Sequence, residues 1–285
     1  MLTELVSIPT DTLPLDGAYY TPEDQPPRGT ALLMHGNTMN FYTGAPRFLP
    51  PYLTALGYVC LAYNRRGHDI LSIRDSREPE GGAFQTAAEG MADNDYAARF
   101  LAGRGFPEPI VIGHSNGGML AAQFAAAHPE TRALALLSAH AGGLETVQQG
   151  CRAGHLAQER LEEVIAEAER LVAAGRGHAL MLLPGWWYAL SAESFLDRLR
   201  NTPDTLAAAP HITCPTLYIR GALEDPTVYP AEEFARRAAG PCAVAILDQC
   251  DHFYNGREDV VARTVTAWLR ETLGEPAERA EASQA

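Results

Sequence analysis

One short stretch of the chain places a serine between glycines. Residues 113–117 read G-H-S-N-G; an apolar run precedes them and an Ala-rich stretch with helical character follows. The G-x-S-x-G pattern between a strand and a helix is typical of a serine nucleophile on a tight turn. The glycines leave room for a close strand–helix approach, and the serine is expected to have a strained backbone. A phosphate-binding turn is disfavoured because no P-loop or G-x-G-x-x-G pattern is present. Ser115 is therefore the predicted nucleophile.

A serine hydroxyl needs a base at neutral pH, and the base needs a carboxylate that orients it. The stretch P-T-L-Y-I-R-G-A-L-E-D-P-T-V predicts a strand followed by a loop that offers Glu224 and Asp225. The stretch C-A-V-A-I-L-D-Q-C-D-H-F-Y-N-G predicts another strand and a loop that offers His252. The order along the chain is serine, acid, histidine.

The rest of the chain must bring these loops together. Short apolar runs alternate with helical patterns, which predicts an α/β fold with a mostly parallel sheet and helices on both faces. After an expected N-terminal hairpin, strands are predicted at 29–36, 59–67, 109–113, 132–140, 215–221 and 242–249. Helices are predicted at 48–58, 87–105, 117–129, 230–240 and 258–274.

Residues 143–210 interrupt this alternation. An amphipathic helix of about five to six turns is expected within 156–177, and one or two short helices after the aromatic run 184–188. The predicted organisation is a core in two parts, residues 1–142 and 211–273, with 143–210 inserted as a helical lid. Residues 274–285 are predicted to be a flexible tail.

Together these motifs resemble the α/β-hydrolase superfamily from about residue 5 to residue 273. The matching pieces are L-L-M-H-G-N, A-Y-N-R-R-G-H-D-I-L-S, V-I-G-H-S-N-G-G, L-Y-I-R-G-A-L-E-D-P-T-V and D-H-F-Y-N-G. The resemblance implies an eight-stranded sheet, a helical lid, and Ser115 and His252 as nucleophile and base. Many relatives place the acid three residues after the strand-ending glycine, which here is Glu224. The Asp-Pro pair, also common in the family, favours Asp225 as the acid.

An oxyanion hole needs two donors. The backbone N–H of Asn116 supplies one, and the resemblance places the second at Asn37; alternatively, Asn37 caps the next turn. The histidines His35 and His114 are expected to be structural, whereas His140 is expected to face the pocket.

Residues 64–72, N-R-R-G-H-D-I-L-S, are expected to buttress the site. They depart from the family pattern at Asn64 and Asp69. Arg65 and Arg66 are expected to form ion pairs within the scaffold; the alternative is that one of them binds a substrate carboxylate.

Five aromatic residues are candidates for substrate binding. Trp186, Trp187 and Tyr188 lie in the insert, and Phe41 and Tyr42 follow the oxyanion loop. Adjacent aromatic residues over a cleft could line an acyl pocket or anchor the lid to the sheet. An aromatic wall favours an uncharged or aromatic ester.

Composition narrows the function further. The formal net charge of −13 argues against a nucleic-acid partner or an anionic membrane surface. Five widely spaced cysteines without C-x-x-C suggest buried free thiols rather than a zinc or redox site. The N-terminus does not resemble a signal peptide, so a cytoplasmic location is expected. No metal or cofactor is expected, and the expected partner is a small-molecule substrate; the sequence leaves a homodimer open.

The sequence thus predicts a serine hydrolase that cleaves a carboxylic ester of small to medium size. The same triad could instead act on a lactone, amide, thioester or C–C bond. A protein of another class, a receptor that uses this fold to bind a ligand with little turnover, is the remaining alternative.

Overall fold

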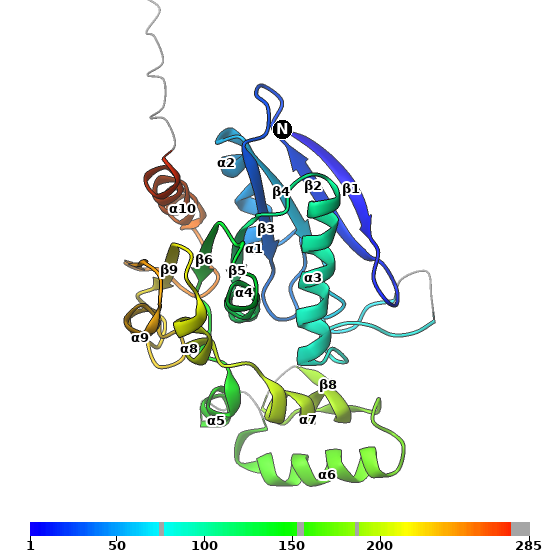
Figure 1. Ribbon diagram of the computed structural model, residues 1–285. Coiled ribbons are helices and arrows are strands. Elements are labelled where there is room, and N and C mark those ends of the chain that lie inside the picture. Colours follow the sequence, from blue (N-terminus) through cyan, green and yellow to red (C-terminus); the bar gives the residue numbers. More distant parts are fainter. Residues whose placement is uncertain (74–76, 153–156, 186–187, 275–285) are drawn as a thin grey trace, which may run out of the picture.

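The computed structural model describes residues 1–73, 77–152, 157–185 and 188–274 (Figure 1). An eight-stranded sheet with the order β1-β2-β4-β3-β5-β6-β9-β10 forms its centre. These strands are β1 (Leu2–Ile8), β2 (Leu15–Thr21), β3 (Gly29–Met34), β4 (Tyr58–Tyr63), β5 (Ile110–His114), β6 (Ala133–Leu137), β9 (Thr216–Gly221) and β10 (Cys242–Leu247). β2 pairs antiparallel with β1 and β4, and the remaining neighbours are parallel. The predicted mostly parallel eight-stranded α/β fold is confirmed.

Helices cover both faces of this sheet. They are α1 (Gly44–Phe48), α2 (Pro50–Ala55), α3 (Ala87–Gly103), α4 (Asn116–Ala127), α8 (Thr205–Ala208), α9 (Ala231–Arg237) and α10 (Glu258–Leu273). One apolar cluster joins one face of the sheet to α3, α4, α8 and α9, and another joins the opposite face to α1, α2 and α10. Every residue of β4, β5, β6 and β9 is buried, because parallel strands are covered on both sides.

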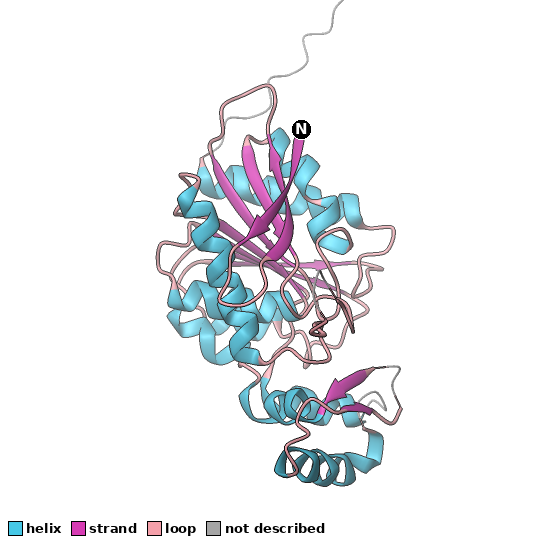
Figure 2. Cartoon of the chain, turned by 90° about the vertical axis from the view of Figure 1, so that its right-hand side faces the viewer, coloured by secondary structure: helices cyan, strands magenta, loops and turns pink. Residues whose placement is uncertain are grey.

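The segment between β6 and β9 forms a smaller body beside the sheet. It contains α5 (Gly143–Arg152), the short 3-10 helix η1 (Gln158–Arg160), α6 (Leu161–Ala173), β7 (Leu180–Leu182), β8 (Ala189–Ser191) and α7 (Ala192–Asn201). Its ends lie side by side, since Gly142 and Asp204 form a β-bridge and Gly143 N–H donates to the Pro203 carbonyl over 3.1 Å. Residues 143–203 are called the cap segment below. Figures 1 and 2 show it beyond one end of the sheet.

The cap segment has its own apolar cluster, which includes Val164, Leu171 and Phe195. Its details differ from the sequence expectation. Helix α6 has 13 residues, fewer than the predicted five to six turns. Part of the region expected to hold only short helices is the antiparallel pair β7–β8. Helix α8 and the 3-10 helix η2 (Ala209–His211) pack on the main core, so the cap segment ends before the predicted boundary at residue 210.

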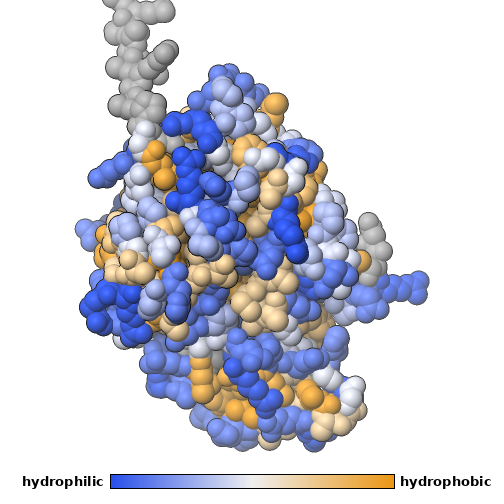
Figure 3. Space-filling model, viewed as in Figure 1, coloured by the Kyte–Doolittle hydropathy of each residue, from blue (hydrophilic) through white to orange (hydrophobic). Residues whose placement is uncertain are grey.

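The described surface adds three observations. Apolar side chains gather on the cap segment in the view of Figure 3, and the exposed apolar residues of this segment include Leu144 and Leu182. No described helix combines the length and apolarity that crossing a membrane requires. All five cysteines are free thiols, and two of them, Cys60 and Cys250, are buried.

Candidate active site

Ser115 stands on a sharp turn between β5 and α4. Its backbone has φ 57° and ψ −121°, a region that residues with a Cβ rarely adopt, so the expected strain is present. A Cβ on Gly113 would lie 2.3 Å from the Gly117 carbonyl oxygen, and one on Gly117 would lie 2.4 Å from the His35 carbonyl oxygen. Only glycine allows the strand, the helix and the loop after β3 to approach this closely. The turn leaves the serine side chain partly exposed at the carboxyl end of the sheet.

His252, in the loop after β10, reaches the serine. The Ser115 hydroxyl lies 3.0 Å from His252 Nε2, and His252 Nδ1 lies 2.7 Å from Glu224 Oε1. The Glu224 side chain is only 3% exposed, whereas that of His252 is 22% exposed. Serine, histidine and a buried carboxylate therefore form one continuous hydrogen-bonded row.

The carboxylate of this row corrects the sequence prediction. Asp225, the favoured acid, is exposed, and its Oδ1 accepts hydrogen bonds from the backbone N–H and the hydroxyl of Thr227. The physical reason is the tight turn after β9, in which Glu224 N–H donates to the Gly221 carbonyl over 3.1 Å. In this turn the third residue after the glycine points toward His252 and the fourth points to solvent. The alternative acid, Glu224, is the partner of the histidine.

The sequence analysis did not single out Ser138 and Tyr254. Ser138 holds Glu224 in place directly, and Tyr254 contacts Ser138. The Ser138 hydroxyl donates to Glu224 Oε2 over 2.5 Å, and Gly221 N–H donates to the same oxygen over 2.7 Å. The Tyr254 hydroxyl lies 2.7 Å from that of Ser138. Ser138 directly follows the buried strand β6, and Tyr254 lies two residues after His252, so a position after a strand and a position next to the candidate base are the signals that could have identified them. Glu224 Oε2 is occupied by these donors, and Oε1 faces the histidine.

The two predicted oxyanion donors lie on touching segments. A Cβ on Gly36 would lie 3.4 Å from the Ser115 Cβ, which places the loop that bears Asn37 beside the serine. Within the described chain, neither the backbone N–H of Asn37 nor that of Asn116 donates a hydrogen bond to a protein acceptor. Asn116 is also the first residue of α4, where helix N–H groups lack intrahelical acceptors. Both N–H groups therefore remain available to a ligand.

Hydrogen bonds of the buried Arg65 and His35 hold the loop after β3 in place. Arg65 is 1% exposed, and its Nη2 donates to the His35 carbonyl over 2.6 Å. His35 Nδ1–H donates to the Gly36 carbonyl over 2.8 Å, and Nε2 accepts from Arg65 N–H over 3.1 Å. Burial, together with the charge of Arg65, holds the pKa of His35 well below its usual range. The neutral His35 has a structural place, as the sequence predicts.

The neighbouring polar residues also support the scaffold. Arg66 forms an ion pair with Asp93 at 2.8 Å, as expected for scaffold pairing. Asn64 Oδ1 accepts from Phe41 N–H over 2.9 Å, and Asp69 accepts from the Asn40 side chain over 3.0 Å. The segment that departs from the family pattern thus fixes the loop that follows Asn37.

Two further histidines lie near His252. His114 Nε2–H donates to the His252 carbonyl over 2.8 Å, which supports the loop of the candidate base from behind. Burial and the neighbouring His252 lower the pKa of His114 to about 4. Burial, His252 and Arg198 lower the pKa of His140 to about 4 as well. His140 Nδ1 accepts a hydrogen bond from Gly142 N–H over 3.1 Å, and its expected position facing the pocket stays a prediction.

The predicted aromatic residues do not form a single described wall. Trp186 and Trp187 lie outside the described residues. Tyr188 is buried in the cap cluster, and its hydroxyl donates to the Gly82 carbonyl over 3.1 Å. Phe41 packs on the core cluster that contains α1 and α2, and Tyr42 is exposed beside it. Tyr188 and Phe41 thus belong to different clusters, and a role for any of these residues in substrate binding stays a prediction.

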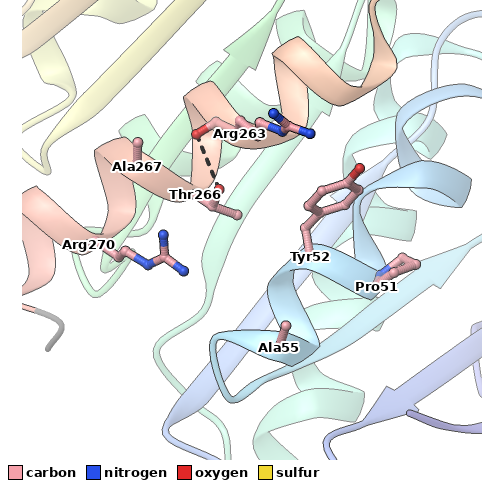
Figure 4. Close-up of a pocket in the computed structure, with 7 residues that line it drawn as sticks. All are labelled: Pro51, Tyr52, Ala55, Arg263, Thr266, Ala267 and Arg270. Carbon is pink, nitrogen blue, oxygen red and sulfur yellow. Dashed lines mark hydrogen bonds between the residues drawn. The ribbon is translucent and has the colours of Figure 1, made fainter. Parts of the chain in front are cut away.

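A surface hollow of about 590 Å³ lies elsewhere (Figure 4). Helices α2 and α10 line it, with Tyr52, Arg263 and Arg270 among its residues. It shares no residue with the serine–histidine–glutamate row. Among the described residues, no cluster of three or more histidine, cysteine or acidic side chains is arranged to hold a metal ion.

Solved structures resemble the whole chain in fold. Est1E from Butyrivibrio proteoclasticus, with ferulic acid bound, matches with a TM-score of 0.71 at 16% identity, over 94% of this chain and 99% of that chain. The esterase domain of a Rhodothermus marinus protein matches with a TM-score of 0.64 at 21% identity, over 96% and 100%. Dienelactone hydrolase from Anabaena variabilis matches with a TM-score of 0.60 at 16% identity, over 95% and 98%. None of the curated proteins matches the chain.

The family comparison agrees with the geometry. The model of the alpha/beta hydrolase family matches residues 31–264, a span that contains the strained serine, the buried glutamate and the histidine. Because this match covers most of the chain, the protein belongs to the α/β-hydrolase family.

Proposed function

We propose that the protein is a serine hydrolase that cleaves carboxylic esters through an acyl-enzyme. The observation that carries this proposal is the row Ser115–His252–Glu224, with distances of 3.0 Å and 2.7 Å between successive partners. When His252 Nδ1–H donates to Glu224 Oε1, Nε2 carries the lone pair that can accept the serine proton. The strained turn and the partial exposure of Ser115 leave its hydroxyl open to a substrate carbonyl.

The reaction follows from this arrangement in two steps. Ser115 Oγ attacks the ester carbonyl while His252 Nε2 takes the hydroxyl proton, and the resulting imidazolium is stabilised by Glu224. His252 then gives that proton to the departing alcohol, which leaves an acyl group on Ser115. In the second step His252 takes a proton from water, the hydroxide attacks the acyl carbonyl, and the proton returns to Ser115 Oγ as the carboxylic acid leaves.

The negative oxygen that develops in each step requires donors. We assign this role to the backbone N–H groups of Asn37 and Asn116. Neither donates a hydrogen bond to a described protein acceptor, and the segments that bear them are in contact beside Ser115. The loss of one such donor typically costs about 3–4 kcal/mol of transition-state stabilisation.

The proposed substrates are esters with a small to medium, apolar or aromatic acyl group. The proposal is supported by the fold shared with Est1E, whose structure holds ferulic acid, a phenolic compound, and with a dienelactone hydrolase. Lactones, amides, thioesters and C–C bonds remain alternatives for the same triad, since the acyl pocket decides among them.

The first test combines turnover with covalent labelling. Wild type and Ser115→Ala are assayed on p-nitrophenyl esters from acetate to dodecanoate, and both are treated with a fluorophosphonate followed by peptide mass spectrometry. We expect wild type to turn over and to be labelled at Ser115, and the variant to lose at least about 10³-fold in kcat. Full activity in Ser115→Ala, or wild type that is folded but neither labelled nor active, would contradict the proposal. The second outcome together with tight ligand binding would favour the receptor alternative.

A further inference from the structure

Arg198, in helix α7 of the cap segment, has only uncharged hydrogen-bond acceptors among the described residues. Its Nη2 donates to the Tyr188 hydroxyl over 2.7 Å and to the Gly82 carbonyl over 2.9 Å. Both Nη1 and Nη2 lie 3.4 Å from Asn37 Oδ1, near the limit of a hydrogen bond. The buried Nε has no partner. Among the described residues, the positive charge of this guanidinium therefore has no negative partner, and not all of its N–H donors have an acceptor.

Two other arginines are paired with carboxylates, whereas the buried Arg65 has, like Arg198, only uncharged acceptors among the described residues. Arg66 is paired with Asp93 at 2.8 Å, and Arg200, two residues further along α7, is paired with Glu169 at 2.8 Å. Within the described residues, no carboxylate lies at ion-pair distance from Arg198, although its side chain is partly buried. Partly burying a cation without an anion is unfavourable, and a ligand of opposite charge at this position would offset that cost.

The position of Arg198 is next to the proposed reaction centre. Its guanidinium contacts the side chain of Asn37, whose backbone N–H is a proposed oxyanion donor. Its charge acts on His140, which is also influenced by His252. Burial, His252 and Arg198 lower the pKa of His140 to about 4, so this histidine is neutral at pH 7 and Arg198 is the fixed positive charge. A guanidinium matches a carboxylate in charge and in planar, two-pronged geometry.

We propose that Arg198 binds a carboxylate of the substrate, so that the preferred substrates are esters whose otherwise apolar acyl group ends in a free carboxylate. Monoesters of short dicarboxylic acids represent this class. The inference rests on the proposed ester hydrolysis, and it replaces the expectation of an uncharged substrate. In contrast to the scaffold arginine Arg66, Arg198 belongs to the cap segment, and its hydrogen bonds to described core residues go to the neutral Asn37 side chain and Gly82 carbonyl.

The alternative for Arg198 is purely structural, a clamp between α7 and the Gly82 carbonyl. A matched pair of substrates separates the two roles. Monomethyl glutarate carries the carboxylate, and methyl 5-amino-5-oxopentanoate replaces it by an uncharged amide of nearly the same size. The proteins are wild type, Arg198→Met, Arg198→Lys and, as a control on the same helix, Arg200→Met.

We expect wild type to favour the charged ester, and Arg198→Met to lower the ratio of kcat/KM for the charged over the uncharged ester by about 30- to 300-fold. Arg198→Lys should restore part of this ratio, because lysine keeps the charge but not the fork. Arg200→Met should leave it unchanged. A ratio that does not change in Arg198→Met, or a wild-type enzyme that prefers the amide, would overturn the inference in favour of the clamp.

A binding measurement keeps this test independent of catalysis. Calorimetry with monomethyl glutarate on Ser115→Ala should show saturable binding that weakens with added salt and disappears in Ser115→Ala/Arg198→Met. Absence of binding, or equal binding by both proteins, overturns the carboxylate site. If neither ester is hydrolysed and Ser115 is not labelled, ester hydrolysis itself fails, while the calorimetry still decides the role of Arg198.

Discussion

The sheet and the cap segment are stabilised in different ways. The sheet is held by continuous ladders of backbone hydrogen bonds and by two apolar clusters that cover its faces. The chain enters and leaves the cap segment at one β-bridge, β8 and α7 of this segment form hydrogen bonds with residues 83–87 of the core, and its own apolar cluster is smaller. The groups proposed to make and break bonds all lie on loops and turns at the carboxyl ends of the strands, whereas Arg198 lies in the cap segment. In the proposed function, the sheet thus positions the reacting groups, and the cap segment supplies Arg198, which contacts the substrate carboxylate.

The largest expected effect concerns the two neighbouring carboxylates of the core. Glu224→Gln should lower kcat by about 10³- to 10⁴-fold, because an amide can donate to Nδ1 and so stabilise the wrong tautomer of His252. Asp225→Asn should change kcat by less than about twofold, since Asp225 is exposed and an asparagine oxygen can still accept from Thr227. Steady-state kinetics on one ester measures kcat for both variants. A larger loss of kcat in Asp225→Asn than in Glu224→Gln would favour Asp225 as the acid, as the sequence predicted.

The next effect compares one leucine in each region. Leu136 is fully buried in β6, and Leu171 is almost fully buried in the cap cluster. Leu136→Ala should lower the free energy of unfolding by about 2–5 kcal/mol. Leu171→Ala should change global unfolding less and should mainly increase hydrogen exchange within 143–203, since a separately packed segment can open locally. Urea unfolding and hydrogen exchange test this. Equal global losses would mean that core and cap unfold as one unit.

A smaller effect is expected from pH. Burial and the neighbouring His252 lower the pKa of His114 from 6.5 to about 4, so the unfolded chain binds more protons between these pH values. Stability should therefore fall as the pH drops from about 6.5 to about 4, with a contribution from His114 on the order of 3 kcal/mol. His114→Gln should reduce this slope in urea unfolding followed over pH. His178→Gln, at a histidine 81% exposed in the cap, is the control, and an equal effect of both would contradict the assignment.

Much of the fold could be predicted because its signals are local. Apolar runs of strand length, helix patterns and punctuating glycines indicated all strands of the main sheet and most of the helices that cover it, whereas the short helix α1 was not predicted. The β7–β8 pair was missed because three-residue strands are too short to show alternation. The length of helix α6 was overestimated because Ala157 has a left-handed backbone and residues Gln158–Arg160 form the separate 3-10 helix η1.

The site was only partly predictable for a similar reason. Ser115 and His252 follow predicted strands, so their place at the carboxyl edge of the sheet could be inferred from the order of elements. The choice between Glu224 and Asp225 depends on the direction in which two adjacent side chains leave one turn. That direction is set by the turn after β9, in which Glu224 N–H donates to the Gly221 carbonyl, and by the donors from Ser138 and Gly221 that hold Glu224 Oε2.

The sequence by itself determined the α/β class, the strained serine and the histidine, because glycine spacing and strand order are properties of the chain. Only the tertiary structure decided that Glu224 completes the row, that Ser138 holds it, and that Arg198 reaches Asn37 across 161 positions in the chain. Contacts between distant segments depend on how whole elements pack, and no local pattern encodes the final direction of a side chain.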